Sequence, residues 1–585
     1  MTSTVHIDTR PEVILASMQE AERPCQIGPG AIRCASTTPH ELRGMLQGLR
    51  DEHGFADLEL LTAEELHPAA SDETDTAGVD NADEAAGDIR SAGVRMVYAL
   101  TRRTDRTTMV IHVDVADGAL TVPSVASLWS GAAPLEREVY DLFGVEFTEH
   151  PALCRIVLRD DFEGHPLRKG FALDGSGVSA DTARTAVKSH GDAHLLADGT
   201  ASAALIPGLP PESLPSAHPG FQTERIVVHM GPQHPSTHGV LHLWLVLDGE
   251  TVVAAQPTQG YLHRCIEKLA ESRDYRACTA LLDRCDYVSG FHTELAHVLA
   301  VEELCGIEPT PKADYLRVAM SELVRITSHH TWYAAAGLDA GALTPFLYAF
   351  IDRELIVDFF EEVTGGRMMF NYFRPGGVKD DLPAGAAARM IEYLRGFDRS
   401  VDDYEALLTG NEIFRARTRG IGFLSRATIR DYCVTGPMAR ASGVDIDLRR
   451  DRPYAAYDRL PVNVMLGETG DTFDRYLVRV AEMRESARLA LAALEGLPEG
   501  PHIAEGVPRV IKPPKGASYR AVESPRGELG VYLVSDGSAH PWRLKVRSPT
   551  FSNIHAAGPL CAGLRLADVA PVVGSIDIVM GEIDR

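Results

Sequence analysis

Short strands are predicted in two separate parts of the chain, because apolar and polar positions alternate there. Residues 95–101 and 107–115 carry this alternation in the N-terminal third. Residues 225–230, 240–247 and 251–255 carry it near the middle of the chain. With a helical pattern just before the first pair, the N-terminal third is predicted to be a small α+β domain.

Longer helical patterns dominate the rest of the chain. Apolar residues recur at helical spacing over residues 287–305, 314–336, 349–364 and 473–494. A further helix is predicted at residues 41–53 in the N-terminal third. The larger part of the chain is therefore predicted to be mainly helical, with small β-sheets at its edges, so the overall fold class is α+β.

A segment rich in Gly, Ser, Ala, Asp and then Pro lies between the two parts. It covers residues 174–223 and has no sustained periodicity, which is typical of a tether. The predicted organisation is a domain over residues 1–173, this linker, and a domain over residues 224–585. Residues 71–88, rich in Asp, Glu, Ala and Gly, are predicted to be a flexible insertion.

The charge balance narrows the class of partner. The 585 residues include 82 acidic and 57 basic side chains, a formal net charge of −25, which disfavours nucleic acid and anionic lipid as main partners. No apolar run approaches the roughly 18 residues of a membrane span, and the first ten residues lack a signal-peptide core. A cytoplasmic chain that can dock on a membrane protein is expected.

The cysteines do not form a metal-binding pattern. Nine are scattered along the chain, and no two form a Cys-x-x-Cys pair. An odd and scattered set disfavours both a disulfide framework and a zinc or iron–sulfur site. We expect reduced cysteines that are mostly buried.

A long motif stands in the N-terminal domain. Residues 135–145, LEREVYDLFGV, predict an amphipathic helix that ends at Gly144. By default its charged positions form a solvated face; they are Glu136, Arg137, Glu138 and Asp141. The segment FEGHPLRK follows at residues 162–169.

Residues 95–173 resemble the 30-kilodalton subunit of respiratory complex I, the NADH:quinone oxidoreductase. In that family this domain is a scaffold without a cofactor. The resemblance therefore assigns no chemistry to His150 or His165.

The segment GPQHPSTHG, residues 231–239, stands between two predicted strands. Gly and Pro bracket it, and Pro235 lies between His234 and His238, so it is predicted to be a loop rather than a helix. From these residues alone, ordinary turn chemistry and a binding role are equally compatible with the histidine pair.

This loop recurs with other motifs in one family. The segments that carry the likeness are residues 231–239, 260–268, 325–329, 339–346, 374–378 and 577–585. Residues 224–585 resemble the 49-kilodalton subunit of complex I. The whole chain thus resembles a fusion of the two subunits, C and D in the bacterial lettering.

The 49-kilodalton family in turn resembles the large subunit of nickel–iron hydrogenases, which hold their metals with four thiolates from an early and a late Cys-x-x-Cys. Here the early position has only Cys285, and the late position, Val579 to Glu582, has no cysteine. One thiolate in place of four cannot hold the nickel–iron centre. We therefore expect no metal in this chain and disfavour a hydrogenase-type large subunit.

The resemblance implies that the corresponding place is a quinone site. His238 and Tyr287 match the residues that contact the quinone headgroup, and Asp339 matches the aspartate that pairs with that histidine. Quinone reduction takes two electrons and two protons, and a phenol or an imidazole can donate a hydrogen bond and then a proton. The alternatives are a structural Tyr287 at a helix start and Asp339 as a turn or cap residue.

The resemblance also concerns electron transfer. Arg264 matches an arginine that lies against the terminal 4Fe-4S cluster of a neighbouring subunit, where a cation makes the cluster easier to reduce; the alternative is a surface ion pair. Two residues depart from the family. Cys265 replaces a glycine, and Met369 stands where a titratable histidine is frequent, which predicts a weaker pH dependence of the cluster potential.

These observations predict a peripheral-arm subunit of a proton-translocating NADH:quinone oxidoreductase, on the cytoplasmic face of the cell membrane. Expected partners are the iron–sulfur subunit, which is lettered B in bacteria, the membrane arm and the substrate quinone. The nucleotide must bind elsewhere, since no Gly-rich strand–turn–helix fingerprint is present. The remaining rivals are a hydrogenase-type large subunit and a structural paralogue that reduces no quinone.

Overall fold

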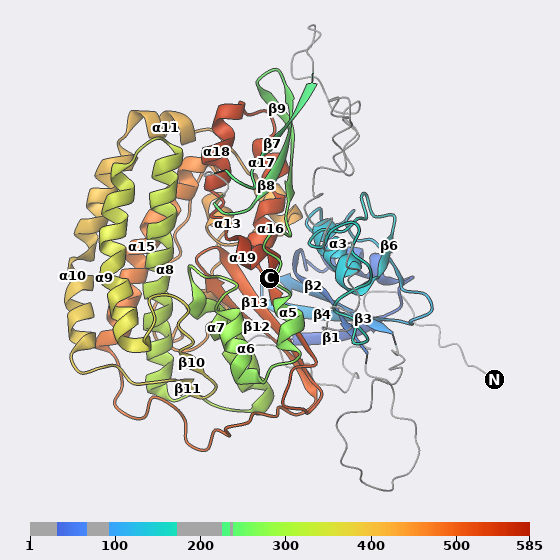
Figure 1. The fold of residues 1–585 in the computed structure, drawn as a ribbon, viewed down its shortest axis with the longest axis horizontal. Helices are drawn as coiled ribbons and strands as arrows, with labels where there is room; N and C mark the ends of the chain where they lie inside the picture. The colour runs from blue at the N-terminus through green and yellow to red at the C-terminus, as the bar shows by residue number, and fades with distance from the viewer. Residues whose placement is uncertain (1–31, 67–92, 172–224, 235–237) are drawn as a thin grey trace. The chain divides into compact units, whose positions relative to one another are not determined.

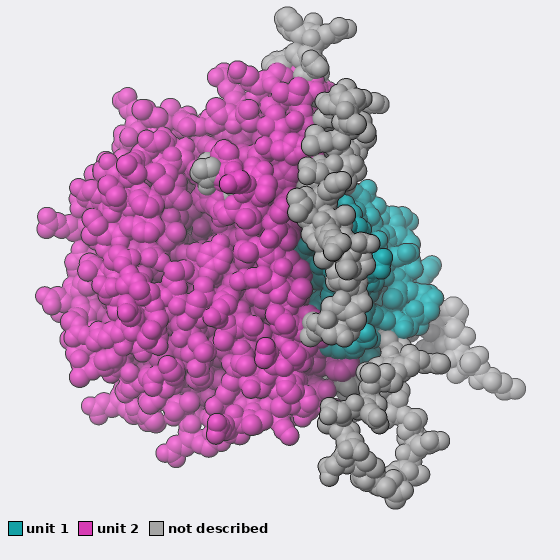
Figure 2. Space-filling view, viewed as in Figure 1, with its two compact units in different colours: residues 1–24, 31–200 teal, residues 25–30, 201–585 magenta. Residues whose placement is uncertain are grey.

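The computed structural model describes residues 32–66, 93–171, 225–234 and 238–585. The chain divides into two compact units, shown in Figure 2: residues 1–24 with 31–200, here the N-terminal unit, and residues 25–30 with 201–585, here the C-terminal unit. The predicted linker and the predicted insertion lie outside the described residues.

The N-terminal unit is built on a four-stranded sheet in the order β1-β4-β3-β2. Its β1–β4 pairing is parallel and the others are antiparallel. The elements are β1 (Ile32–Thr37), α2 (Leu42–Asp51), β2 (Asp57–Glu65), β3 (Val94–Arg102), β4 (Thr107–Val115), β5 (Thr121–Pro123), α3 (Ala132–Phe143) and β6 (Glu146–Thr148). The two predicted strands and the predicted helix before them are confirmed, whereas β1 and β2 were not predicted.

Helix α3 ends at Gly144, as predicted, with a left-handed φ of 79° that suits glycine. The expected solvated face is wrong, because Glu136, Glu138 and Asp141 are all buried. Burial is tolerated because these carboxylates find donors: Glu136, for example, accepts hydrogen bonds from Ser124 Oγ and from the amide of Val125.

The C-terminal unit contains a bundle of four long helices that run side by side in Figure 1. They are α8 (Pro311–Asp339), α9 (Thr344–Thr364), α10 (Ala386–Tyr404) and α15 (Thr472–Glu495). Helix α7 (Gly290–Cys305) packs between α8 and a three-stranded antiparallel sheet. That sheet consists of β12 (Gly516–Ser524), β13 (Gly527–Ser535) and β14 (Arg543–Arg547). The four predicted helices are confirmed with shifted ends; α10 and the sheet were not predicted.

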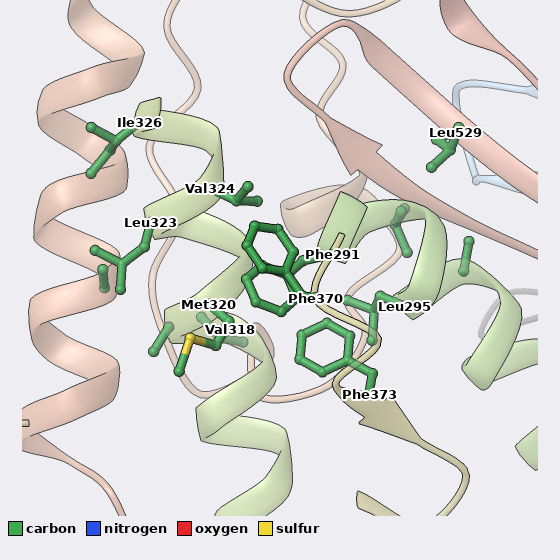
Figure 3. Packing of buried hydrophobic residues seen from close by; sticks show 14 of the residues in the cluster. Phe291, Leu295, Val318, Met320, Leu323, Val324, Ile326, Phe370, Phe373 and Leu529 are labelled. Carbon is green, nitrogen blue, oxygen red and sulfur yellow. The ribbon is translucent and has the colours of Figure 1, made fainter. Parts of the chain in front are cut away.

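Aromatic packing joins α7 to the loop after α9. Phe291 stacks on Phe370 with ring centroids 3.9 Å apart and nearly parallel planes, and Phe373 lies against the same ring (Figure 3). Leu323 and Val324 of α8 are buried in the same cluster. This packing fixes the start of α7, next to the predicted site residue Tyr287.

A second antiparallel sheet, in the order β7-β8-β9, carries the histidine loop. Its strands are β7 (Arg225–Met230), β8 (His242–Asp248) and β9 (Thr251–Thr258), close to the predicted ranges. Leu243, Leu245 and Leu247 are buried, as the predicted alternation requires, but His242 and Val246 on the other face of β8 are buried too. The observed mixture of helices and small sheets confirms the α+β class.

Short elements complete the C-terminal unit. They are α5 (Ile266–Ala270), α6 (Tyr275–Leu282), β10 (Phe373–Arg374), β11 (Gly377–Val378), the π-helix η5 (Glu405–Thr409), α11 (Glu412–Thr418), α12 (Arg426–Asp431), α13 (Pro437–Ala441), α14 (Leu448–Asp451), α16 (Pro549–His555), α17 (Ala557–Cys561), α18 (Leu566–Gly574) and α19 (Met580–Asp584). Within the described ranges, no helix combines the length and hydropathy that a membrane crossing needs.

Candidate functional site

The structure brings together two of the predicted site residues, His238 and Asp339. His238 stands in the loop between β7 and β8, with a left-handed φ of 51°. Asp339 is the last residue of α8, 101 positions further on, and its Oδ2 accepts a hydrogen bond from His238 Nε2 at 2.9 Å. The two side chains are 12% and 8% exposed, so the pair is largely shielded from water.

A glycine at the end of α18 makes room for this pair. A Cβ atom on Gly574 would lie 2.4 Å from Asp339 Oδ2 and 3.3 Å from His238 Nε2. The carbonyl oxygen of Gly574 also accepts a hydrogen bond from Trp332 Nε1 of α8 at 3.0 Å. A larger residue at this position would displace the carboxylate, so the C-terminal part of the chain forms one wall of the pair.

Tyr287 does not begin a helix, contrary to the prediction, because α7 starts at Gly290 and Tyr287 lies in the preceding turn. Its ring packs closely against the C-terminal segment: a Cβ atom on Gly581 would lie 3.0 Å from the ring and 2.8 Å from the carbonyl oxygen of Cys285. In the loop of His238, a Cβ atom on Gly239 would lie 3.3 Å from Met580 Cγ.

Residues 574–582, here called the C-terminal segment, therefore lie against three of the predicted site residues, His238, Asp339 and Tyr287. The segment meets the His238–Asp339 pair at Gly574 and the Tyr287 ring at Gly581. Glycine is needed at both contact points, because neither Gly574 nor Gly581 has space for a side chain.

The electrostatic surroundings of Tyr287 are mixed. Burial raises the pKa of Tyr287, the positive charges of Arg526 and Arg264 lower it, and the negative charge of Asp286 raises it. The phenol is thus protonated at neutral pH, and two cations are close enough to influence the loss of that proton.

Arg264 is exposed, and its Nη2 donates a hydrogen bond to the carbonyl oxygen of Arg284 at 2.5 Å. Its neighbour Cys265 has a left-handed φ of 56° at the N-cap of α5, a conformation that suits the glycine of the family pattern. Arg264 is thus at the surface and within electrostatic reach of Tyr287.

The residues present do not fit a thiolate-held metal. Burial raises the pKa of Cys285 to about 12, against the opposing charge of Arg264, so this thiol keeps its proton. Among the residues that the structure describes, no group of three His, Cys, Asp or Glu side chains is arranged to hold a metal ion. The seven cysteines whose side chains the structure describes are free, and four of them are buried.

One buried arginine close to Tyr287 was not foreseen from the sequence. Arg526, in the turn between β12 and β13, donates from Nη1 to Asp286 Oδ2 at 2.8 Å and from Nη2 to Ser328 Oγ at 3.0 Å. Its Nε lies 3.7 Å from Oδ2 of Asp577 in the C-terminal segment. The sequence offered one signal for it, because Asp577 and Glu582 stand within the apolar run around Val579. Charged residues in such a run are rarely buried without a partner of opposite charge.

Two family models match the chain on either side of the predicted linker. Residues 36–177 match the model described as respiratory-chain NADH dehydrogenase, 30 Kd subunit. Residues 339–511 and 504–585 match the model described as respiratory-chain NADH dehydrogenase, 49 Kd subunit. The NADH-quinone oxidoreductase subunit lettered D of Geotalea uraniireducens is 47% identical over 388 residues, which cover 62% of this chain and 99% of that protein.

The chain belongs to the 49-kilodalton subunit family of the respiratory-chain NADH dehydrogenases, joined to a 30-kilodalton subunit domain.

Other relatives in the 49-kilodalton family show the same extent of similarity. The corresponding subunit of Carboxydothermus hydrogenoformans is 47% identical over 364 residues, 62% of this chain and all of that protein. That of Clostridium beijerinckii is 46% identical over 365 residues, 62% of this chain and 98% of that protein. The relatives thus correspond to one part of the chain, consistent with a fusion of the two subunits lettered C and D.

Proposed function

We propose that this chain is the fused scaffold and quinone-site subunit of a proton-translocating NADH:quinone oxidoreductase. The relatives are named as the NADH-quinone oxidoreductase subunit lettered D, and both family models belong to that enzyme. The observation that carries the proposal is the C-terminal segment, which contacts both the His238–Asp339 pair and the Tyr287 ring. Parts of the chain that are distant in sequence thus contact one short segment, which supports a common site for the imidazole and the phenol.

Tyr287 and His238 supply the protons in this proposal. The Tyr287 phenol donates a hydrogen bond to one quinone oxygen and then its proton. Asp339 accepts from His238 Nε2 and so fixes the ring; when the ring is an imidazolium, it carries a second N–H on Nδ1 that can be donated to a quinone oxygen. Asp339 therefore orients the imidazole, and burial of the pair keeps water from competing for these hydrogen bonds.

The electrons are proposed to come from a 4Fe-4S cluster held by the neighbouring iron–sulfur subunit. The exposed guanidinium of Arg264 suits a position against such a cluster. A positive charge there stabilises the reduced cluster and so raises its potential. This chain itself is proposed to bind no metal and no cluster.

The remaining partners are proposed to be other subunits of the complex, including the membrane arm. An exposed apolar row supports docking close to the site, because it begins on α8 beside Asp339 and continues along α9 at intervals of four residues. The row consists of Leu338, Leu343, Leu347, Ile351 and Leu355. Docking there would hold the chain as a peripheral protein on the cytoplasmic face of the membrane.

The proposed function is tested in the native assembly isolated from membranes. NADH-driven, inhibitor-sensitive quinone reduction should fall at least about a hundredfold when His238→Ala and Tyr287→Phe are combined, because both proton donors are removed. The matched controls are His540→Ala in the β13–β14 loop and Tyr393→Phe in α10, both outside the site. NADH oxidation by an artificial acceptor reports that the assembly is intact.

An unchanged rate of quinone reduction in the double variant would contradict the proposed site and favour a structural paralogue. The fold likeness to hydrogenase large subunits is a further part of the proposal, without the metal centre. Elemental analysis of the purified assembly should therefore find no nickel, whereas stoichiometric nickel would favour the hydrogenase alternative.

A further inference from the structure

Four charged side chains form a buried group behind Tyr287, here called the Arg526 cluster. Asp286 and Arg526 are 0% and 1% exposed, and they form a direct ion pair at 2.8 Å. Asp577 lies 3.7 Å from Arg526 Nε, and Glu582 is fully buried two positions after the start of α19. The charges of Asp286, Asp577 and Glu582 all reach Arg526: burial opposes its ionisation, and these carboxylates raise the pKa of Arg526.

The cluster contains more carboxyl groups than cations. Three carboxyl groups share the single guanidinium of Arg526. The next cation is Arg479 of α15, and burial lowers the pKa of Arg479 to about 10 although Asp577 raises it. An uncompensated buried carboxylate costs several kcal/mol, so a group in this position keeps its proton instead.

The geometry assigns that proton to Glu582. Burial raises the pKa of Asp286, but this carboxylate accepts from Arg526 and from the amide of Ser289, so a cation and an amide stabilise its anionic form. Glu582 has no cation in direct contact: its Oε2 accepts from Thr550 Oγ1, and its Oε1 has no hydrogen-bond partner within the described part of the chain. Burial, with repulsion from Asp286, raises the pKa of Glu582 to about 8.

We propose that Glu582 is a positioning residue for quinone reduction: by remaining protonated, it leaves the charge of Arg526 available to Tyr287. This inference rests on the proposed function of the site. Gly581, the neighbour of Glu582, packs against the Tyr287 ring, so the acid and the phenol are joined through one residue of the C-terminal segment.

The reacting step is the transfer of the phenolic proton. The O–H bond of Tyr287 breaks, an O–H bond forms on the quinone oxygen, and a phenolate remains. The two electrons arrive one at a time through the iron–sulfur centre of the neighbouring subunit, which NADH reduces again after each transfer. The second proton comes from His238, and both donors recover a proton from solvent. Arg526 stabilises the phenolate, and ionisation of Glu582 would oppose this by adding a negative charge to the cluster.

The groups that face Glu582 come from several elements. They are Asp286 and Cys285 from the turn before α7, Arg526 from the β12–β13 turn, Thr550 from α16 and Asp577 from the C-terminal segment. Cys285 keeps its proton, Thr550 is neutral and Asp286 is paired directly with Arg526, so Glu582 is the group of this set whose raised pKa lies near 8 without a cation in contact. We therefore expect quinone reduction to decline as the pH rises through about 8.

The test is the pH profile of the Glu582→Gln variant in the native assembly. The wild-type rate should fall up to about tenfold between pH 7 and one unit above the pKa of Glu582, and the variant should lose this decline because an amide cannot ionise. An unaltered decline in the variant would overturn the proposal. A complete loss of quinone reduction at every pH, with the assembly intact, would also overturn it, since the acid would then act by giving its own proton.

Two controls separate the possible failures. Glu485→Gln alters another buried glutamate, in α15, and should leave the alkaline decline in place. Tyr287→Phe tests the underlying site: an unchanged rate there contradicts the proposed function. A lost rate in Tyr287→Phe together with an unaltered decline in Glu582→Gln contradicts the role of Glu582 alone.

Discussion

Asp141 and the Arg526 cluster show two ways in which this chain buries carboxylates. Asp141, in the N-terminal unit, accepts from the amides of Ile156, Val157 and Leu158 at 2.9 to 3.0 Å and from Arg155 at 2.6 Å. The cluster in the C-terminal unit leaves Glu582 Oε1 and Asp577 Oδ2 without hydrogen bonds among the described residues.

The difference separates a structural carboxylate from a titratable one. A fully hydrogen-bonded carboxylate has one stable charge state and fixes the chain around it. A cluster that has too few hydrogen-bond donors for its carboxylates is stable only when some of them are protonated, so its energy depends on pH. Buried charge alone therefore does not identify a functional group, and missing hydrogen bonds beside a proposed binding residue are the stronger indication.

The largest effect is expected for Asp141→Ala. The variant leaves Arg155 and three amides without their acceptor, so the free energy of unfolding should fall by about 3–5 kcal/mol. Denaturant unfolding of the full chain, followed by a signal from the N-terminal unit, measures this. The matched control is Asp114→Ala, which removes an exposed partner of Arg95 and should cost at most about 1 kcal/mol. Equal losses in the two variants would contradict the structural role of Asp141.

A pH-dependent stability is expected at Asp283 and Glu294, a second poorly compensated pair. Burial raises the pKa of Asp283 to about 6, and burial with repulsion from Asp283 raises the pKa of Glu294 well above its usual range. The folded chain thus binds a proton more tightly than the unfolded chain, so stability is lost as the pH rises from about 4 through 6.

The Asp283→Asn variant should lose this dependence. Between pH 4 and 7 its free energy of unfolding should rise relative to wild type by on the order of 2 kcal/mol. Denaturant midpoints measured across this range test the expectation. If the free energies of unfolding of the two proteins change in parallel with pH, the pKa of Asp283 is not raised in the folded chain, and the expectation is contradicted.

An intermediate effect is expected for Asp339→Asn, which keeps the shape of the side chain and removes its charge. The amide can still accept from His238 but removes the negative charge beside the ring, so quinone reduction should fall at least about tenfold, or 1.4 kcal/mol in the barrier. Steady-state rates in the native assembly measure the fall. A raised KM with an unchanged kcat would contradict a role in proton transfer.

The sequence predicted the long elements well, because the patterns at α7, α8, α9 and α15 extend over several turns. It failed for the sheet β12–β14, whose strands carry buried charges such as Glu523 and Arg543 instead of a simple alternation. The charged face expected on α3 was wrong for the same reason, since Asp141 finds buried donors far along the chain.

The site residues His238, Tyr287, Asp339 and Arg264 came from the family resemblance, not from periodicity. Sequence reasoning did not foresee that the C-terminal segment contacts their surroundings, because Gly574 and His238 are more than 300 positions apart and no local pattern records such a contact. The role of Arg526 was not predicted either, because an isolated arginine in a turn is ordinarily exposed to solvent.

The smallest effect is expected for Met369→His. Met369 is half-buried and has a left-handed φ of 59°, a conformation in which histidine is more frequent than most residues. A titratable group there should make the potential of the proposed 4Fe-4S cluster of the neighbouring subunit more dependent on pH, by coupling electron uptake to proton uptake. A redox titration at several pH values measures the slope, and an unchanged slope would contradict the coupling.

The most direct test of the proposed quinone site is labelling by a photoreactive quinone analogue in the native assembly, followed by mass spectrometry of the peptides. The account predicts label on the peptides that contain His238 and Tyr287, and loss of that label when excess quinone competes. Label confined to other parts of the chain, or label on these peptides that excess quinone does not displace, would contradict the assignment of the site.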